Sequence, residues 1–363
     1  MALGCTIHTA FIYDRGGARR LFQVDLPSSI RWERLRDDIS GATVVIRDPS
    51  KGCQEAMTKV HPNRHELVIY RGTERVWEGP ISRMGWHRDF IEVEARDVMY
   101  YAYRTVMRAG YDNSSTNVAS TITRSVNVLG GELARKEALS PPINVLPYVT
   151  TYTTPNDAQT SRKTVPFQST VFQDIDSMAH RVGMDYVTIG RRILLFDTHT
   201  VWAKTPQVTE ADFLGDIIVT YYGLEHATHA TVTSSEGLYG TTGANDAFYG
   251  EWEILDNAYD ESGTVAPTEA ALLSQAVRNL DGRNPVPLHV RVPDNAQLNP
   301  NGVLKIAHLV PGIRIPLRAT LLSLEVSQMQ KLDRVVVSED GERGESIQVT
   351  LSPASQNDEE PEE

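Results

Sequence analysis

The segment Glu225-His226-Ala227-Thr228-His229 holds the clearest candidate metal ligands in the sequence. Two histidines beside a glutamate bind zinc when a helix brings them onto one face. The surrounding residues, YYGLEHATHATV, instead predict a strand, in which residues three apart point to opposite faces. We therefore predict that no zinc is bound here.

Three acidic residues, Asp256, Asp260 and Glu261, are candidate calcium ligands. They lack the D-x-D-x-D-G order and the terminal glutamate of an EF-hand loop. A solvated acidic loop is therefore favoured over a calcium site, which stays open as the alternative.

Catalysis would need a nucleophile, a nucleotide-binding loop or a pair of carboxylates. G-x-S-x-G, P-loop and dinucleotide motifs are absent from the sequence. The glycine-rich segment 234–246 precedes no helical pattern, so we expect a flexible loop. With 47 Asp and Glu residues, only the fold could identify a pair that hydrolyses a glycosidic bond. The prediction is a protein that is not an enzyme and carries no cofactor and no metal, with glycan binding by a loop left open.

The first hundred residues predict an antiparallel sheet. Four stretches are rich in β-branched or alternating residues: 42–47, 66–70, 75–83 and 90–96. In the last of them, Ile91, Val93 and Ala95 share one face, which we expect to be buried. Gly79-Pro80 removes a backbone donor and a side chain from the third stretch. It predicts a bulge, a bend or a sheet corner, as a small closed barrel requires.

Aromatic residues flank this corner. For Trp77 and Trp86 we predict packing in the core or in an interface, and a sugar-binding platform is the alternative. The same prediction applies to the tyrosine cluster Tyr100, Tyr101 and Tyr103. Asp97 is placed to cap a short helix that carries these tyrosines.

The middle of the chain is polar at first and then helical. A Ser/Thr/Asn-rich linker from residue 109 allows a short helix around Ile122, and a long loop is expected at 141–156. Thr170 and Gln173 form a capping box, and apolar residues follow at helical spacing to a stop at Gly183. A hairpin over 184–197 is predicted next, with its turn at Gly190-Arg191.

The last part of the chain returns to strands. Strands are predicted at 217–222, 230–233, 288–292, 302–306, 314–326, 334–337 and 346–351, and a helix starts at Pro267 and stops at Asp281-Gly282. The pattern of 91–95 recurs at 347–351, which is compatible with two barrels. The end of the chain, NDEEPEE, predicts an acidic disordered tail, and we expect no further domain after the last strand.

Length and charge limit the function. The 363 residues suggest two or three domains. With 47 acidic and 35 basic side chains, the net charge of −12 argues against stable nucleic-acid binding. No apolar run is long enough for a membrane helix and no signal peptide is evident, so synthesis and assembly in the cytoplasm are expected.

The order of these motifs resembles the tail hub proteins of long-tailed bacteriophages, also called tail-tip, baseplate hub or minor tail proteins. The resemblance covers most of the chain, and is carried by Val76-Trp77-Glu78-Gly79-Pro80-Ile81, Ile91-Glu92-Val93, Asp97 with Arg104, the helix 170–183 with its hairpin, Ala276-Val277-Arg278, 288–292 and 298–302. At 300–302 this chain has Pro-Asn-Gly where family members often have Pro-Gly-Asp. The structural motif residues are Trp77, Gly79, Pro80, Ile81, Trp86, Asp97 and Gly183.

The resemblance implies a mainly β chain with two related β-barrel domains separated by a small α+β segment. The corresponding domains are 1–108, 109–207 and 208–352 with an inserted helix, followed by the tail 353–363. It also implies a homotrimer at the tip of the virion tail, whose six barrels form a ring between the sixfold tail tube and a threefold fibre or spike. The expected partners are the distal tail protein ring, the tape measure protein, and the tip fibre, spike or other minor tail proteins. A tail-tip protein that binds or degrades cell-wall glycans is the alternative.

Overall fold

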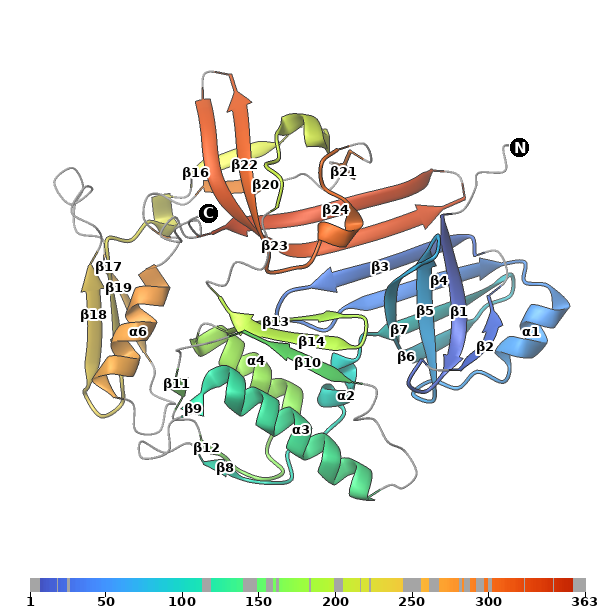
Figure 1. The fold of residues 1–363 in the computed structure, drawn as a ribbon, viewed down its shortest axis with the longest axis horizontal. Coiled ribbons are helices and arrows are strands. Elements are labelled where there is room, and N and C mark those ends of the chain that lie inside the picture. The colour runs from blue at the N-terminus through green and yellow to red at the C-terminus, as the bar shows by residue number, and fades with distance from the viewer. Residues whose placement is uncertain are drawn as a thin grey trace.

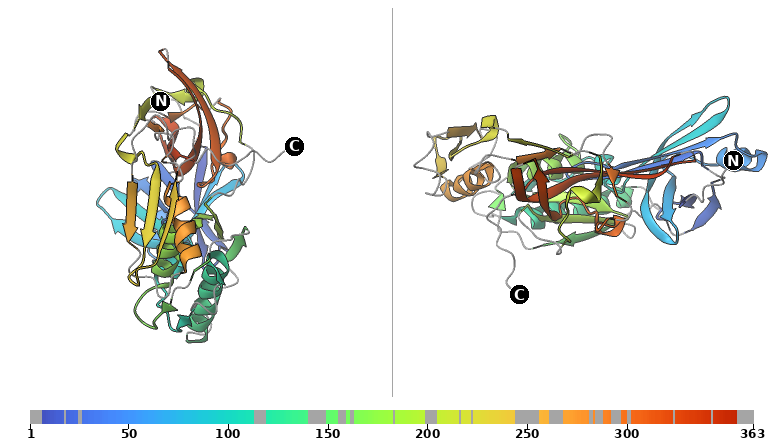
Figure 2. Two further views of the ribbon diagram at one scale, coloured as in Figure 1. Left: turned by 90° about the vertical axis from the view of Figure 1, so that its left-hand side faces the viewer. Right: turned by 90° about the horizontal axis from the view of Figure 1, so that it is seen from above.

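The computed structural model describes most of the 363 residues. The described ranges are 7–17, 19–24, 27–112, 119–139, 149–154, 159–160, 163–182, 184–198, 205–215, 217–221, 223–243, 256–260, 268–280, 283, 288–291, 297–299, 302–322, 324–341 and 343–354. The prediction of a mainly β chain with α+β parts is confirmed, and Figures 1 and 2 show the arrangement of these parts.

The first region is an antiparallel set of strands with one short helix. Its elements are β1 (His8–Asp14), β2 (Arg20–Gln23), β3 (Ser29–Leu35), β4 (Gly41–Arg47), α1 (Lys51–Met57), β5 (His65–Arg71), β6 (Glu74–Trp86) and β7 (Phe90–Arg96). Ile91, Val93 and Ala95 are buried on one face of β7, as their alternation predicts. The four predicted stretches therefore all form strands.

The last region continues the same sheet. Its strands are β22 (Arg314–Leu321), β23 (Leu324–Asp340) and β24 (Gly344–Pro353). The order is β2-β1-β5-β6-β7-β4-β3-β23-β22, with β24 also paired to β23, so the antiparallel pair β3–β23 joins the two ends of the chain. One hydrophobic core includes side chains from both regions. Among the described strands, no pairing closes either region into a barrel.

An α+β unit lies between these regions in sequence. Its elements are α2 (Met99–Tyr103), β8 (Tyr111–Asp112), β9 (Ala119–Ser120), α3 (Thr121–Leu139), β10 (Thr150–Thr153), β11 (Gln159–Thr160), β12 (Lys163–Thr164), α4 (Val171–Val182), β13 (Met184–Ile189) and β14 (Arg192–Asp197). The helices pack on the sheet β10-β14-β13 and form a second core, below that sheet in Figure 1. The predicted capping box is present, since Gln173 N donates to Thr170 Oγ1 at 3.2 Å and Thr170 N donates to Gln173 Oε1 at 2.9 Å.

Two expectations for this unit are wrong. The polar segment after residue 109 contains the 19-residue helix α3, not only a short one. Its buried Ile122, Leu129 and Leu133 follow helical spacing inside a Ser/Thr-rich, Gly-Gly-containing sequence that obscured the pattern. The expected loop at 141–156 contains β10, which pairs in parallel with β14 and consists of threonines and a tyrosine, residues with high strand propensity.

The third part contains short strands and a separate small layer. Its elements are η2 (Glu210–Asp212), β15 (Phe213–Leu214), β16 (Ile218–Tyr221), η3 (Gly223–Glu225), β17 (His229–Thr233), β18 (Tyr239–Gly243), β19 (Asp256–Asp260), α6 (Glu269–Leu280), β20 (Leu288–Arg291), β21 (Gln297–Leu298) and η4 (Ile306–His308). Helix α6 covers the sheet β18-β17-β19 and forms a small third core with it, at the left of Figure 1. A Cβ on Gly240 would lie 2.2 Å from Leu273 N, so this glycine allows the close contact between β18 and α6.

Several predictions for this part are wrong. The glycine-rich segment 234–246 is not simply a loop, because it contains β18, and the acidic residues Asp256 and Asp260 bound the strand β19. Residues 302–306 form no strand, since Gly302 N donates to Asn299 O at 2.8 Å and Val303 N to Asp212 Oδ1 at 3.0 Å. The expected strand 314–326 is divided, and its halves belong to the hairpin of β22 and β23.

Candidate functional site

The strand β6 changes partners at Gly79-Pro80. Up to Pro80 it pairs with β5, and from Ile81 onward it pairs with β7. Register shifts on either side leave Val76 and Ser82 without partners in the ladder, which marks a bulge before and after the glycine. Bulges bend a strand and increase its twist. The sequence Gly-Pro therefore lies at a corner between two parts of the sheet.

Position 79 requires glycine because neighbouring backbone atoms leave no space for a side chain, and not because of its backbone dihedrals. A Cβ at this position would lie 1.8 Å from the carbonyl oxygen of Arg96 and 2.9 Å from Cα of Asp97. Real Cβ contacts of this length do not occur, so any larger residue must push the end of β7 away from β6. The corner thus brings β6 directly against the residue that starts the connection to α2.

Asp97 holds that connection. Its carboxylate accepts from Ser40 N at 2.6 Å and from Met99 N at 2.8 Å. The N-cap position of α2 is occupied by Val98, and Asp97 lies one residue before it. Asp97 still accepts a hydrogen bond from the first residue of the helix, Met99. Burial raises the pKa of Asp97 to about 7, although both backbone hydrogen bonds act to lower it.

The other motif residues lie in different environments. Trp77 and Ile81 are buried in the shared core. Trp86 is 50% exposed at the far end of β6, so packing in the core of the chain is wrong for this residue. Gly183 lies outside the described residues. The motif residues therefore meet at the corner only in part.

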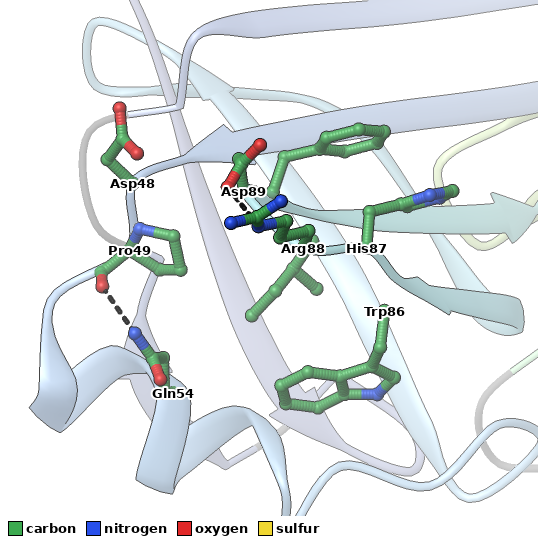
Figure 3. Close-up of a pocket in the computed structure, with 9 residues that line it drawn as sticks. Asp48, Pro49, Gln54, Trp86, His87, Arg88 and Asp89 are labelled. Atoms are coloured by element: carbon green, nitrogen blue, oxygen red, sulfur yellow. Dashed lines mark hydrogen bonds and ion pairs between the residues drawn. The ribbon is translucent and has the colours of Figure 1, made fainter.

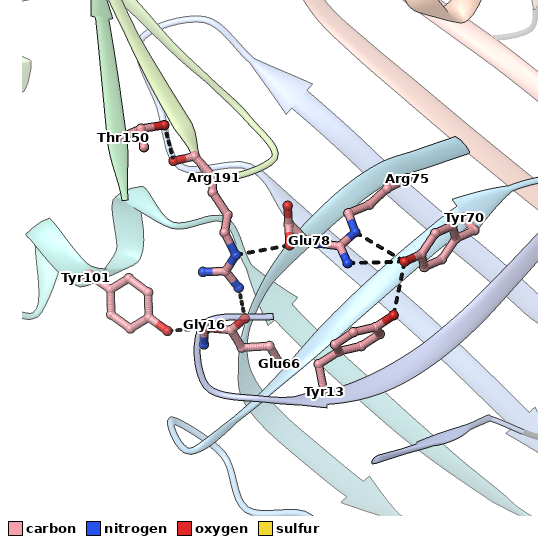
Figure 4. Close-up of polar contacts among 9 residues, drawn as sticks. All are labelled: Tyr13, Gly16, Glu66, Tyr70, Arg75, Glu78, Tyr101, Thr150 and Arg191. Carbon is pink, nitrogen blue, oxygen red and sulfur yellow. Dashed lines mark hydrogen bonds and ion pairs between the residues drawn. The ribbon is translucent and has the colours of Figure 1, made fainter. Parts of the chain in front are cut away.

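A buried ion network joins the first region to the α+β unit (Figure 4). Arg191, in the turn between β13 and β14, forms ion pairs with Glu66 on β5 and, at 3.2 Å, with Glu78 on β6. Arg75 also contacts Glu78, at 2.9 Å. Burial raises the pKa of the Glu78 carboxyl, and the charge of Arg75 opposes this. Tyr101 on α2 donates to Glu66 at 2.7 Å and completes the joint.

A second buried cluster connects all three parts of the structure. Arg36 follows β3 and contacts Asp185 on β13 at 3.3 Å and Asp333 on β23 at 2.7 Å. Lys331 on β23 pairs with the same Asp185. Burial alone would raise the pKa of Asp185, but Lys331 and Arg36 hold it below its usual value. Next to them, burial and the charge of Asp185 raise the pKa of Asp37 to about 7.

Neither cluster is predicted from the sequence. Glu78 stands inside the apolar strand segment 76–81, and a charged residue there is a detectable signal for a buried ion pair, whereas Glu66 follows Arg64 and His65 at the start of β5 and gives no such signal. Their common partner Arg191 is 125 positions from Glu66, so the pairing itself has no local signature.

Among the described residues, the candidate metal ligands do not assemble into a site, and Glu261 lies outside the described residues. The strand expected across 221–232 is interrupted, because 223–225 form a turn of 3₁₀ helix and the next strand begins only at His229. In the described part of the chain, no three His, Cys, Asp or Glu side chains gather closely enough to hold a metal ion. No described helix has the length and apolar character needed to cross a bilayer. The polar clusters that the structure does show are joints between its parts.

Solved structures of tail proteins share this fold. The 43 kDa tail protein of prophage MuSo2 from Shewanella oneidensis aligns with a TM-score of 0.58 and 10% identity over 95% of this chain and 98% of that one. A tail protein from Neisseria meningitidis gives a TM-score of 0.61 and 12% identity, over 95% and 96%. The Escherichia coli protein c3393 gives 0.51 and 10%, over 91% and 74%. It is described as a type VI secretion component similar to the T4 bacteriophage tail proteins gp27 and gp5.

No protein-family model and no curated protein sequence matches the chain. At the identities found, the likeness concerns the fold. The chain therefore has the fold of phage tail proteins, and that fold extends over nearly its whole length.

Proposed function

We propose that this chain is a structural tail-tip hub protein of a long-tailed bacteriophage. The observation that carries the proposal is the match to tail proteins over 95% of the chain, which includes all parts of the fold and not one common domain. The resemblance of the sequence motifs to tail hub proteins is independent support. The further likeness to a secretion protein compared with gp27 and gp5 agrees with a hub position.

In this proposal the chain forms a homotrimer, in which each subunit contributes the strand regions from the two ends of the chain and the α+β unit that lies between them in sequence. The trimer joins the sixfold end of the tail tube, through the distal tail protein ring, to a threefold fibre or spike. The shared sheet and the two buried ion clusters favour such a role, because they connect the parts of one subunit into a unit that can transmit force. The protein is assembled in the host cytoplasm and remains at the virion tail tip.

The tape measure protein and the viral DNA pass through the tail in this account. A net charge of −12 suits such a passage, because a wall without excess positive charge does not retain DNA. No catalytic step is assigned to the chain. Degradation of the cell wall would belong to another protein of the tail.

The proposal is tested by mixing the purified full chain with the distal tail protein and measuring the mass of the complex. A complex with three copies of this chain per ring is expected. The chain alone is permitted to be a monomer, because the neighbouring ring can be required for assembly. The alternative function is tested separately by zymography on peptidoglycan, for which no lysis is expected. Reproducible lysis that one Asp or Glu substitution abolishes would overturn the structural role.

A further inference from the structure

A hollow of about 310 Å³ opens at the outer end of the first region, beside α1 and the β6–β7 hairpin (Figure 3). Trp86 from the end of β6 and Asp89 from the hairpin turn line one part of it. Asp48 and Gln54, from the start of the α1 segment, line another part. Neither the corner at Gly79 nor the buried ion clusters involve this site, so it has no role in the joints described above.

One aromatic surface dominates the hollow. The Trp86 side chain is 50% exposed, and its indole ring lies along the open space in Figure 3. A tryptophan buries more apolar area than any other residue when it makes a contact, so its exposure here leaves an unused binding surface. Ile91, the cross-strand partner of Trp86, and the apolar Pro49 and Phe90 also line the hollow. Most of the remaining lining residues carry charged or polar groups, with Arg88 placed across the hollow from the indole.

Short-range contacts hold the walls in place. His87 and Phe90 stack with ring centroids 3.9 Å apart, and His87 N donates to Phe90 O at 3.0 Å. Asp48 N donates to Asp89 O at 3.0 Å, which ties the α1 segment to the hairpin turn. The hollow is therefore formed before any ligand binds, which lowers the entropic cost of binding.

The polar side chains that line the hollow have groups available for hydrogen bonds to a ligand. Arg88 and Asp89 form only a long contact of 4.0 Å, and both side chains are largely exposed. Among the described residues, the Asp48 carboxylate accepts no hydrogen bond. Gln54 uses its Nε2 to reach Pro49 O at 2.9 Å, which leaves its amide oxygen as an acceptor. Two carboxylates, an amide and a guanidinium thus surround a single aromatic face.

We propose that this hollow binds a carbohydrate ring. The C–H face of a pyranose is apolar and stacks on an indole, while its vicinal hydroxyls suit carboxylate, amide and guanidinium groups. One aromatic face with several polar groups around a hollow of this size suits a small polyhydroxylated ring. Two carboxylates against one guanidinium give the site a negative balance, so uncharged and amino sugars bind better than acidic ones. The sugar contact lies beyond the structural role proposed above, which needs no ligand.

The inference is tested with the purified full chain by saturation-transfer NMR against glucose, galactose, N-acetylglucosamine and glucuronate. At least one uncharged sugar is expected to bind with a dissociation constant of about 1 mM, and glucuronate at least about fivefold more weakly. Trp86→Ala should weaken binding by about tenfold or more, and Trp86→Phe, which keeps a ring, by less. Asp89→Asn should also weaken it, whereas Tyr103→Ala removes an exposed aromatic side chain elsewhere and should leave it unchanged.

Two results would overturn the inference. One is the absence of transfer to any sugar at about 10 mM, ten times the expected dissociation constant. The other is unchanged sugar binding in Trp86→Ala, whether or not that substitution alters the number of subunits. Sugar binding is measured on the chain irrespective of its assembly, so a failed trimer would leave this test intact.

Discussion

Gly79 shows how one residue without a side chain fixes the corner of β6. Because a Cβ there would lie 1.8 Å from Arg96 O, Gly79→Ala is expected to lower the free energy of unfolding by about 3 kcal/mol or more. The control is Gly130→Ala in the middle of α3, where a Cβ would meet nothing within 4 Å. In that variant the free energy of unfolding should rise by about 0.5–1 kcal/mol, since alanine is the better helix former. Chemical denaturation of both variants measures the difference, and equal stabilities would refute the contact.

Asp97 makes stability depend on pH. Its pKa is raised from 3.8 to about 7 by burial, so between these values the folded state keeps a proton that the unfolded state loses. The folded state then binds more protons, and its stability falls as pH rises from 4 to 7, by up to about 1.4 kcal/mol per pH unit. Above pH 7 the loss is complete.

Asp97→Asn should remove this component, because asparagine does not titrate. Urea denaturation at pH 5 and pH 7.5 is compared for both proteins, so that contributions from other carboxylates cancel in the difference. The variant is expected to be less stable at pH 5, since its amide group cannot accept from both Ser40 N and Met99 N. A parallel loss of stability with pH in both proteins would contradict the assignment to Asp97.

At the scale of elements, Arg191 connects the β13–β14 turn to β5 and β6. Arg191→Ala would leave Glu66 and Glu78 buried without this cation and should destabilise the joint by about 3–5 kcal/mol. Arg192→Ala, at the exposed neighbouring position, should change stability by less than about 0.5 kcal/mol. Hydrogen exchange should show increased exchange in β5 and β14 of the first variant only. Similar exchange in both variants would show that the ion pairs do not hold the joint.

Elements with local signals could be predicted from the sequence. The capping box of Thr170 and Gln173, the glycine turn at Gly190 and the alternation in β7 each involve a few neighbouring residues, and each is present. The pairing of β3 with β23 is different, since Arg34 lies opposite Val335, about three hundred positions away. No periodicity in either strand specifies that partner, and the strand order therefore could not be derived.

The same limit applies to the candidate sites. Gly79-Pro80 predicted a corner because proline and glycine act on their own backbone. The exposure of Trp86 could not be predicted, because the residues next to a tryptophan at a strand end do not show whether its side chain is buried or exposed. The expected acidic loop became the strand β19 because its partner β17 lies more than 20 positions earlier in the sequence.

At the scale of the whole molecule, the net charge predicts that the chain does not bind DNA stably. With a net charge of −12, the purified protein should not retain duplex DNA in a gel-shift experiment at 50 mM salt. At low salt, electrostatic attraction would be strongest, so this condition is the most demanding for the prediction. Binding whose log affinity falls steeply with log salt would contradict the proposed passage of DNA through a ring of this protein.

The most direct measurement for the proposed role is electron cryo-microscopy of intact phage tails that contain this chain. Three copies are expected in one ring at the tail tip, below sixfold tail components, with an inner wall that is acidic or neutral. The two ends of each chain should lie in the same ring through the shared sheet. A dimer in the tail, a position outside the tip, or a lumen lined mainly by Lys and Arg would contradict the account.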